Sequence, residues 1–373
     1  MDNFDTQSRS PTPRRRHRIA PLRNLIALAA LALLTSANCQ PLVSSQPEDL
    51  VNAIKPLIRN NPEGPLAYML VSHMFFSMME RGQFASAGTL LQWEFQSRER
   101  FTDGQWLASM TIDAYAQYLK LSPPSWNEQW AVIQSWRHAQ PRNGDAAIVE
   151  ATYWLSYAWY ARGDGPMRAV PVGAMRKTNE RAAKARKVLE AAKPYASNNP
   201  AWYASMLDVA LLQRWPLEKR LALFDEAVKA EPSYYPTYFR MATSLMPRWG
   251  GNLADYHRFV ETSVITTKPV DGNSMYARLY WHLSDNGDCC QDMLLTLGIP
   301  WPKMKSGFDD IMQRYPGSQW NRQNYAYFAC REGDGKTFLE LLPKLDQNVI
   351  ESYNVWRGSY TLDYCKAQFT SRT

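Results

Sequence analysis

The sequence predicts an all-α fold built of helical hairpins. From residue 47 onward the apolar residues recur at spacings of three and four, and the alternation typical of strands is nearly absent. Segments rich in Gly, Pro and Asn interrupt this pattern at short intervals. One pair of segments also repeats. With 373 residues, of which 45% are hydrophobic, the chain has ample material for a large core.

The interruptions divide the chain into helices joined by short turns. Helices connected in this way pack antiparallel to their neighbours along the chain. The predicted turns fall at residues 60–65, 101–104, 121–125, 140–145, 162–166, 197–200, 230–236 and 314–318.

The repeat has a period of 34 residues, which is the period of the tetratricopeptide helix–turn–helix unit. The first unit has an apolar, a large, a small and a helix-ending residue where such a unit requires them, at Leu207, Phe224, Ala227 and Pro232. We therefore predict a tetratricopeptide-like helical hairpin array, an α-solenoid, with an irregular multi-helix bundle as the alternative. The matched positions of the two units are Leu207 and Met241, Leu211 and Leu245, Arg214 and Arg248, and Trp215 and Trp249.

Residues 1–38 predict a signal peptide or a membrane anchor. The basic segment "RRRHRIAPLR" precedes an apolar run at residues 25–34 and then small residues, the order found in secretory signals, with cleavage expected after Ala37. Lipidation of Cys39 is a second interpretation, which Asn38 disfavours, and an uncleaved anchor is a third. All three interpretations place the rest of the chain in the periplasm or outside the cell, and two of them tether it to a membrane.

After this segment, two parts are expected. Residues 39–165 form N-terminal helical hairpins, and residues 166–373 form tetratricopeptide-like repeats with a cysteine-containing C-terminal part. The Gly- and Pro-rich segment with basic residues at 163–177 is the spacer that divides them.

Four cysteines in the last quarter of the chain predict disulfides, because an even number is expected in an oxidising compartment. The adjacent Cys289 and Cys290 are poorly placed to bond to each other. We expect them to reach separately to Cys330 and Cys365. A zinc site is the alternative, but the sequence has no CxxC and His282 has no partner at ligand spacing.

The charge and the motifs exclude several functions. The formal charge is +7, but residues 1–38 supply most of it, so a nucleic-acid partner is not expected. No phosphate loop, nucleophile elbow or metal signature is found, so neither a cofactor nor a catalytic residue is predicted. His73 is interpreted as a core residue. His138, His257 and His282 are scattered, and Asp285 three residues after His282 is weak evidence for a base.

The aromatic residues and one basic helix each allow two interpretations. The chain has 14 Trp and 20 Tyr, spaced as expected for residues that fill seams between helices, with a ligand-stacking platform as the alternative. The helix around residues 176–193 is strongly basic. A solvated face is the ordinary interpretation, and contact with anionic lipid headgroups is the alternative.

The string "LMPRWGGN" at residues 245–252 reads as a corner between helices. Pro247 ends one helix, Gly250 and Gly251 permit unusual backbone angles, and Asn252 caps the next helix. In the earlier unit Pro216 fits the first helical position. We interpret the tryptophans as structural, and ligand contact as the alternative. The candidate ligand contacts are Arg248, Trp249, Arg214 and Trp215.

Several strings together resemble a bacterial helical family classed as a domain of unknown function that often carries tetratricopeptide-like repeats. They are "RERFTDGQW", "AWYARGDG", "YYPTYFRMATSLMPRWGGN", "YARLYW" and "NYAYFACREGD", and the Pro-Arg-Trp-Gly-Gly motif is the most specific. The resemblance covers residues 80–356. It implies a helical-repeat fold and assigns no catalytic residue.

The sequence thus predicts an envelope helical-repeat protein that acts as a scaffold for a protein or peptide partner, because solenoids expose a long concave face. The first alternative is an enzyme, a hydrolase or lyase acting on envelope polysaccharide. A cleft with two nearby carboxylates beside exposed tryptophans would favour it. A purely structural envelope component is the third interpretation.

Overall fold

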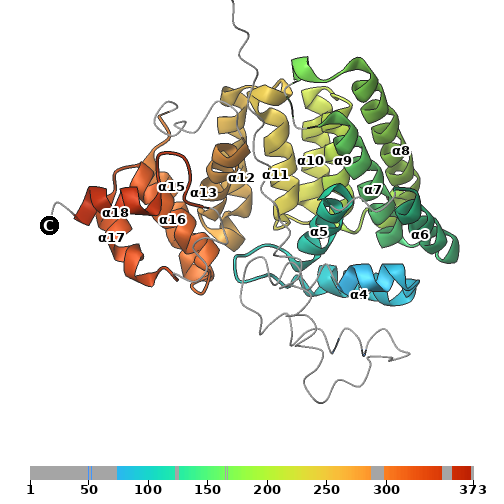
Figure 1. Cartoon of the computed structure of the whole chain (residues 1–373), viewed down its shortest axis with the longest axis horizontal. Coiled ribbons are helices and arrows are strands. Elements are labelled where there is room, and N and C mark those ends of the chain that lie inside the picture. The colour runs from blue at the N-terminus through green and yellow to red at the C-terminus, as the bar shows by residue number, and fades with distance from the viewer. Residues whose placement is uncertain are drawn as a thin grey trace, which may run out of the picture. The chain divides into compact units, whose positions relative to one another are not determined.

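The computed structural model describes Asp49, Asn52 and residues 74–121, 126–163, 165, 167–286, 298–346 and 355–370, all within one compact unit, Gln46–Thr373. The elements of these residues are helices (Figure 1), with isolated bridges at Arg100–Trp106 and Arg357–Tyr360. The predicted all-α class is confirmed. The helices are α4 (Phe84–Ser97), α5 (Leu107–Leu121), α6 (Trp126–Ala139), α7 (Gly144–Arg162), α8 (Val172–Ala196), α9 (Pro200–Leu212), α10 (Leu217–Ala230), α11 (Tyr235–Leu245), α12 (Leu253–Asp271), α13 (Ser274–Asn286), α15 (Trp301–Arg314), α16 (Gln319–Arg331), α17 (Gly335–Leu341) and α18 (Leu362–Thr370), with 3-10 turns at Met167–Ala169, Pro247–Trp249 and Leu342–Lys344 and a helical stretch at 74–80.

Two sets of contacts build the unit. From α6 to α13 each helix packs against the next one along the chain. In addition, α5, α7, α9, α11 and α13 pack against one another in series; we call these five helices the odd series. Almost every residue of α9 is buried, as expected for a helix that is apolar all round and has neighbours on every side. The helices α7 and α8, which lie on either side of the predicted boundary at residues 165–166, pack along each other.

The positions predicted for the repeat seam are buried. Leu207, Phe224 and Ala227 are each at most 5% exposed. The Phe224 ring meets Tyr238 and Phe259 edge-on, with centroids 5.3 and 5.0 Å away, so it joins α10 to both α11 and α12.

Short polar side chains start several helices. At Asn143, Asn199, Asn252, Ser318 and Asp334 the side chain accepts a hydrogen bond from a backbone N–H of the following first turn. The predicted cap at Asn252 is therefore confirmed.

The loop between α4 and α5 contacts residues far away in the sequence. The Trp106 indole donates a 2.8 Å hydrogen bond to the carbonyl of Ser233, in the turn before α11. The carbonyl of Asp103 accepts from Arg278 at 2.9 Å and from Asn321 at 3.0 Å, on α13 and α16. This α4–α5 loop therefore links the first described helices to the last third of the unit.

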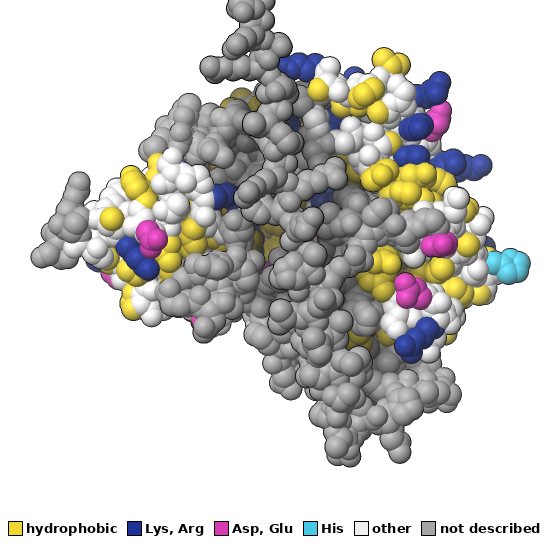
Figure 2. Space-filling view, viewed as in Figure 1, with side chains coloured by type: hydrophobic (Ala, Val, Ile, Leu, Met, Phe, Trp, Pro, Cys, Tyr) yellow, Lys and Arg dark blue, Asp and Glu magenta, His cyan; other side chains and the backbone are white. Residues whose placement is uncertain are grey.

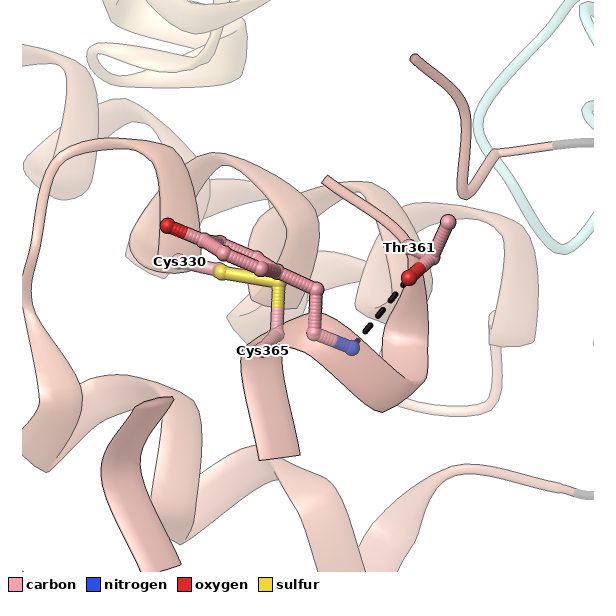
Figure 3. Close-up of a disulfide and its surroundings, with 4 residues drawn as sticks. Cys330, Thr361 and Cys365 are labelled. Atoms are coloured by element: carbon pink, nitrogen blue, oxygen red, sulfur yellow. Dashed lines mark hydrogen bonds between the residues drawn. A yellow bond between two sulfur atoms is a disulfide. The ribbon is translucent and has the colours of Figure 1, made fainter. Parts of the chain in front are cut away.

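The predicted disulfide pairing is wrong. Cys330 on α16 is bonded to Cys365 on α18, with Cα atoms 5.8 Å apart (Figure 3). Neither is therefore free to bond to Cys289 or Cys290, which lie outside the described residues, as does Cys39. The error arose because spacing alone does not show that the fold brings Cys330 of α16 next to Cys365 of α18.

Candidate binding groove

The odd series forms a groove of about 250 Å³. Each of its five helices contributes residues, so the groove runs across the whole series rather than between two neighbours. The lining residues are Ser109, Ile112, Asp113 and Ala116 on α5, Thr152, Leu155, Ser156 and Trp159 on α7, Ala201, Ala204, Ser205, Asp208 and Leu211 on α9, Tyr234, Pro236, Arg240 and Thr243 on or beside α11, and His282 and Asn286 on α13.

A charged triad lies in this groove. Arg240 on α11 holds Asp113 of α5 through Nη2 at 3.0 Å and Asp208 of α9 through Nε at 2.9 Å. The pKa of Arg240 is raised above its ordinary value, chiefly by Asp208. The Asp113 side chain is 43% exposed, against 18% for Asp208, so Asp113 is the carboxylate that a ligand can reach. The triad carries a net charge of −1.

His282 adds a neutral polar group. Its Nε2 lies 2.9 Å from the hydroxyl of Thr243, and its Nδ1 lies 3.2 Å from the amide nitrogen of Asn286. Burial, together with the charge of Arg240, lowers the pKa of His282 to about 4, so the ring is uncharged at neutral pH. Asp285, which the sequence offered as its partner, forms an ion pair with Arg357 instead.

The second Arg-Trp pair contacts two residues that line the groove. Trp249 meets the groove residue Trp159 edge-on at 5.3 Å, and the guanidinium of Arg162 lies 4.4 Å from the centre of the Trp249 ring. Arg248 donates a 3.1 Å hydrogen bond to the carbonyl of Asn286, another groove residue. Two residues of the string "LMPRWGGN" therefore contact side chains or backbone of residues that line the groove.

The first Arg-Trp pair has a different environment. Trp215 donates to the side chain of Gln213 at 3.0 Å, and Arg186 of α8 stacks over its ring at 4.9 Å. Arg214 is exposed and has a positive φ of 54°. The backbone of Trp215 closes the end of α9 by donating to the carbonyl of Ala210 at 2.8 Å. The two pairs thus share a position after a helix and differ in their contacts.

A second pocket of about 400 Å³ lies beside α4 and the N-terminus of α7. Its acidic residues hold the local structure together. Asp145 accepts from Asn199 at 2.9 Å, and burial raises its pKa to about 6. Glu231 binds Ser233 at 2.7 Å and Arg98 at 2.8 Å.

The other histidines do not join either pocket. His138 is exposed, and His73 lies outside the described residues. His257 pairs with the hydroxyl of Tyr280 at 2.6 Å, and burial lowers its pKa. Among the described residues no group of His, Cys, Asp and Glu side chains has an arrangement suited to a metal ion.

The triad was missed in the sequence because its members are separated widely. Asp113, Asp208 and Arg240 lie on three helices; Asp208 and Arg240 are the single charges of α9 and α11, and Asp113 is the single acidic residue of α5. Such isolated charges in buried helices are the available signal, since a charged side chain on an apolar helix requires a partner. That signal indicates a pairing without identifying the partners.

No protein-family model matches the chain, and no curated protein matches it significantly. The resemblance to the helical family of unknown function therefore stays a prediction, and no residue role is taken from a relative.

Proposed function

We propose that the protein is a tetratricopeptide-like solenoid scaffold of the bacterial envelope that binds an extended peptide segment in the odd-series groove. One observation carries the proposal: five successive alternate helices line a single groove. A solenoid places the first helix of each hairpin on its concave face, where extended ligands bind.

The location in the envelope has two supports. The N-terminal sequence has the order of a secretory signal. The Cys330–Cys365 bond is typical of proteins in oxidising compartments. Among the described residues no helix is both long and apolar enough to cross a membrane.

The lining indicates the chemistry of the peptide. Ile112, Leu155 and Trp159 supply apolar surface, and the exposed side of Asp113 is placed to accept a cation. With His282 uncharged, the groove has a net negative charge at neutral pH. We therefore propose a peptide with apolar side chains and at least one Lys or Arg.

The test is selection of ligands from a random peptide library on the purified protein, followed by affinity measurements. Ala116 lines the groove, whereas the adjacent Gln117 is exposed outside it. Ala116→Trp fills the groove and should weaken binding by at least about tenfold, because a buried contact surface is lost. The matched change Gln117→Trp should have little effect.

Charge provides a second arm of the same test. Asp113→Asn should weaken the binding of peptides that contain Lys or Arg by about fivefold, as expected for a partly exposed ion pair. The affinity for uncharged peptides should not change. Selected peptides whose affinity is the same for Ala116→Trp and the unchanged protein would contradict the proposal. Binding or cleavage of oligosaccharides in the groove would favour the enzyme instead, although both groove carboxylates are already paired with Arg240.

A further inference from the structure

The end of α7, the turn that follows it and the start of α8 expose apolar side chains that do not line the groove. Tyr160 is 54%, Met167 37% and Val172 88% exposed, and all three fall within 13 positions of the chain. Val172 is the most exposed large apolar side chain among the described residues. Exposed apolar side chains that gather in one place mark interaction sites.

The same part of the chain is strongly basic. Residues 160–196 contain nine Lys or Arg and three Asp or Glu. This short segment therefore has a net charge close to that of the whole chain, which is +7. On the face shown in Figure 2, Lys and Arg side chains lie among hydrophobic ones where Figure 1 places α8, at the upper right. Exposed basic residues close to the apolar ones are Arg168, Arg176 and Lys177.

The α8 helix turns one face inward and leaves the other exposed. Thr178, Ala182, Ala185 and Leu189 are buried and recur at three and four, so they fix the orientation of α8 against α7. Arg176 and Lys177 precede this stripe and are exposed. Packing of the buried stripe therefore leaves these basic residues on the surface.

Some basic residues of α8 are occupied within the protein. Arg181 donates to the carbonyl of Tyr157 at 2.6 Å and lies 3.2 Å from the centre of its ring. Lys184 lies 4.2 Å from the centre of the Trp154 ring. Near the start of α8, Arg176 lies 3.8 Å from the carboxylate of Glu180, and both side chains are exposed. We define the corner patch as Tyr160, Met167, Arg168, Val172, Arg176 and Lys177, all of which are exposed.

We propose that the corner patch docks on a membrane surface that contains anionic lipid. Met167 and Val172 enter the headgroup region, and Arg168 and Lys177 contact lipid phosphates. A basic surface alone would suit any polyanion, but apolar side chains at the tip gain free energy only where they leave water. Apolar and basic residues together are the combination that interfacial membrane binding uses.

The test measures flotation of the full chain with phosphatidylcholine vesicles, with and without phosphatidylglycerol. Arg168→Gln with Lys177→Gln should reduce binding to the anionic vesicles by about 30-fold, from the known contribution of each basic residue near such a surface. Met167→Asn with Val172→Asn should reduce it by about tenfold, because apolar groups leave the interface.

Matched controls lie elsewhere on the surface. Lys219→Gln with Lys229→Gln changes two exposed lysines on α10, and Ile265→Asn changes a side chain on α12 that is 73% exposed. Both controls should bind vesicles like the unchanged chain. Circular dichroism of each variant verifies that the fold is kept.

A readout at the patch itself separates its contribution from that of the apolar N-terminal run. A photo-crosslinking amino acid at position 172 should label lipid on illumination, and the same group at position 265 should not. The proposal would be overturned by equal lipid labelling at positions 172 and 265, or by an equal loss of vesicle binding in the patch variants and the controls. Vesicle binding that does not depend on phosphatidylglycerol would also overturn it. Binding of the patch to duplex DNA without binding to vesicles would do the same.

Discussion

At the scale of single residues, the structure buries an ionisable group where the sequence shows an ordinary helix. Glu94 on α4 is fully buried, and only its Oε1 accepts a hydrogen bond, from Thr111 at 2.9 Å. Its Oε2 has no hydrogen-bond partner among the described residues. Burial raises the pKa of Glu94 to about 8, and the Thr111 bond offsets part of that effect.

Glu94 therefore makes stability depend on pH. The unfolded chain loses the proton near the ordinary pKa of 4.5, whereas the folded chain keeps it up to about 8. Between these values the folded state binds more protons, so the free energy of unfolding falls as the pH rises.

Glu94→Gln removes this dependence because an amide stays neutral. The Tm of the variant relative to the unchanged protein should rise steadily from pH 4.5 to 8. Thermal unfolding by circular dichroism across this range measures it. Glu218→Gln on the exposed face of α10 is the control, with a constant difference expected. A constant difference for Glu94→Gln as well would show that the carboxyl is ionised in the folded protein.

At the scale of helices, sequence patterns locate most boundaries because turns depend on local chemistry. The turns predicted at 140–145, 197–200 and 314–318 lie between α6 and α7, α8 and α9, and α15 and α16. Pro194 and Pro269 lie within helices but mark their ends, since they fall in the last turns of α8 and α12. Partners distant in sequence were not predictable, as the wrong cysteine pairing shows.

The disulfide is the covalent support of the C-terminal helices. It closes a loop whose ends are 35 residues apart, and a loop of this length contributes about 4 kcal/mol in the chain-entropy model. Cys330→Ala with Cys365→Ala should lower the free energy of unfolding of the C-terminal helices by about that amount. Urea unfolding measures the difference in the free energy of unfolding between the double variant and the unchanged protein.

Hydrogen exchange shows where the loss of the bond is felt. Amides of α18 should exchange faster in the double variant, while those of α7 keep their protection, because local opening does not require global unfolding. Reduction of the unchanged protein should reproduce the effect on α18. A double variant within about 1 kcal/mol of the unchanged protein would show that helix packing alone holds α18 in place.

At the scale of the whole unit, the repeat period predicts contacts between helices that are neighbours in the sequence. It does not predict the contacts of the α4–α5 loop with distant helices. The α4–α5 loop is part of the string "RERFTDGQW" and bonds to α13 and α16. Its glycine, Gly104, has a φ of +91°, which only glycine adopts without strain. A Cβ atom there would lie 2.6 Å from the Tyr315 ring and 2.8 Å from Nη2 of Arg278.

Gly104→Ala should therefore destabilise the unit through both backbone strain and overpacking, by about 3 kcal/mol in the free energy of unfolding. Gly82 provides the matched control, since its φ is +69° and a Cβ there would meet nothing within 4 Å. Gly82→Ala should have only the backbone cost of about 1 kcal/mol. Urea unfolding followed by both circular dichroism and tryptophan fluorescence compares them. Because the loop bonds to α13 and α16, which are far from it in the sequence, the two signals should shift together for Gly104→Ala. Equal effects of the two substitutions would show that the α4–α5 loop yields without disturbing α13 and α16.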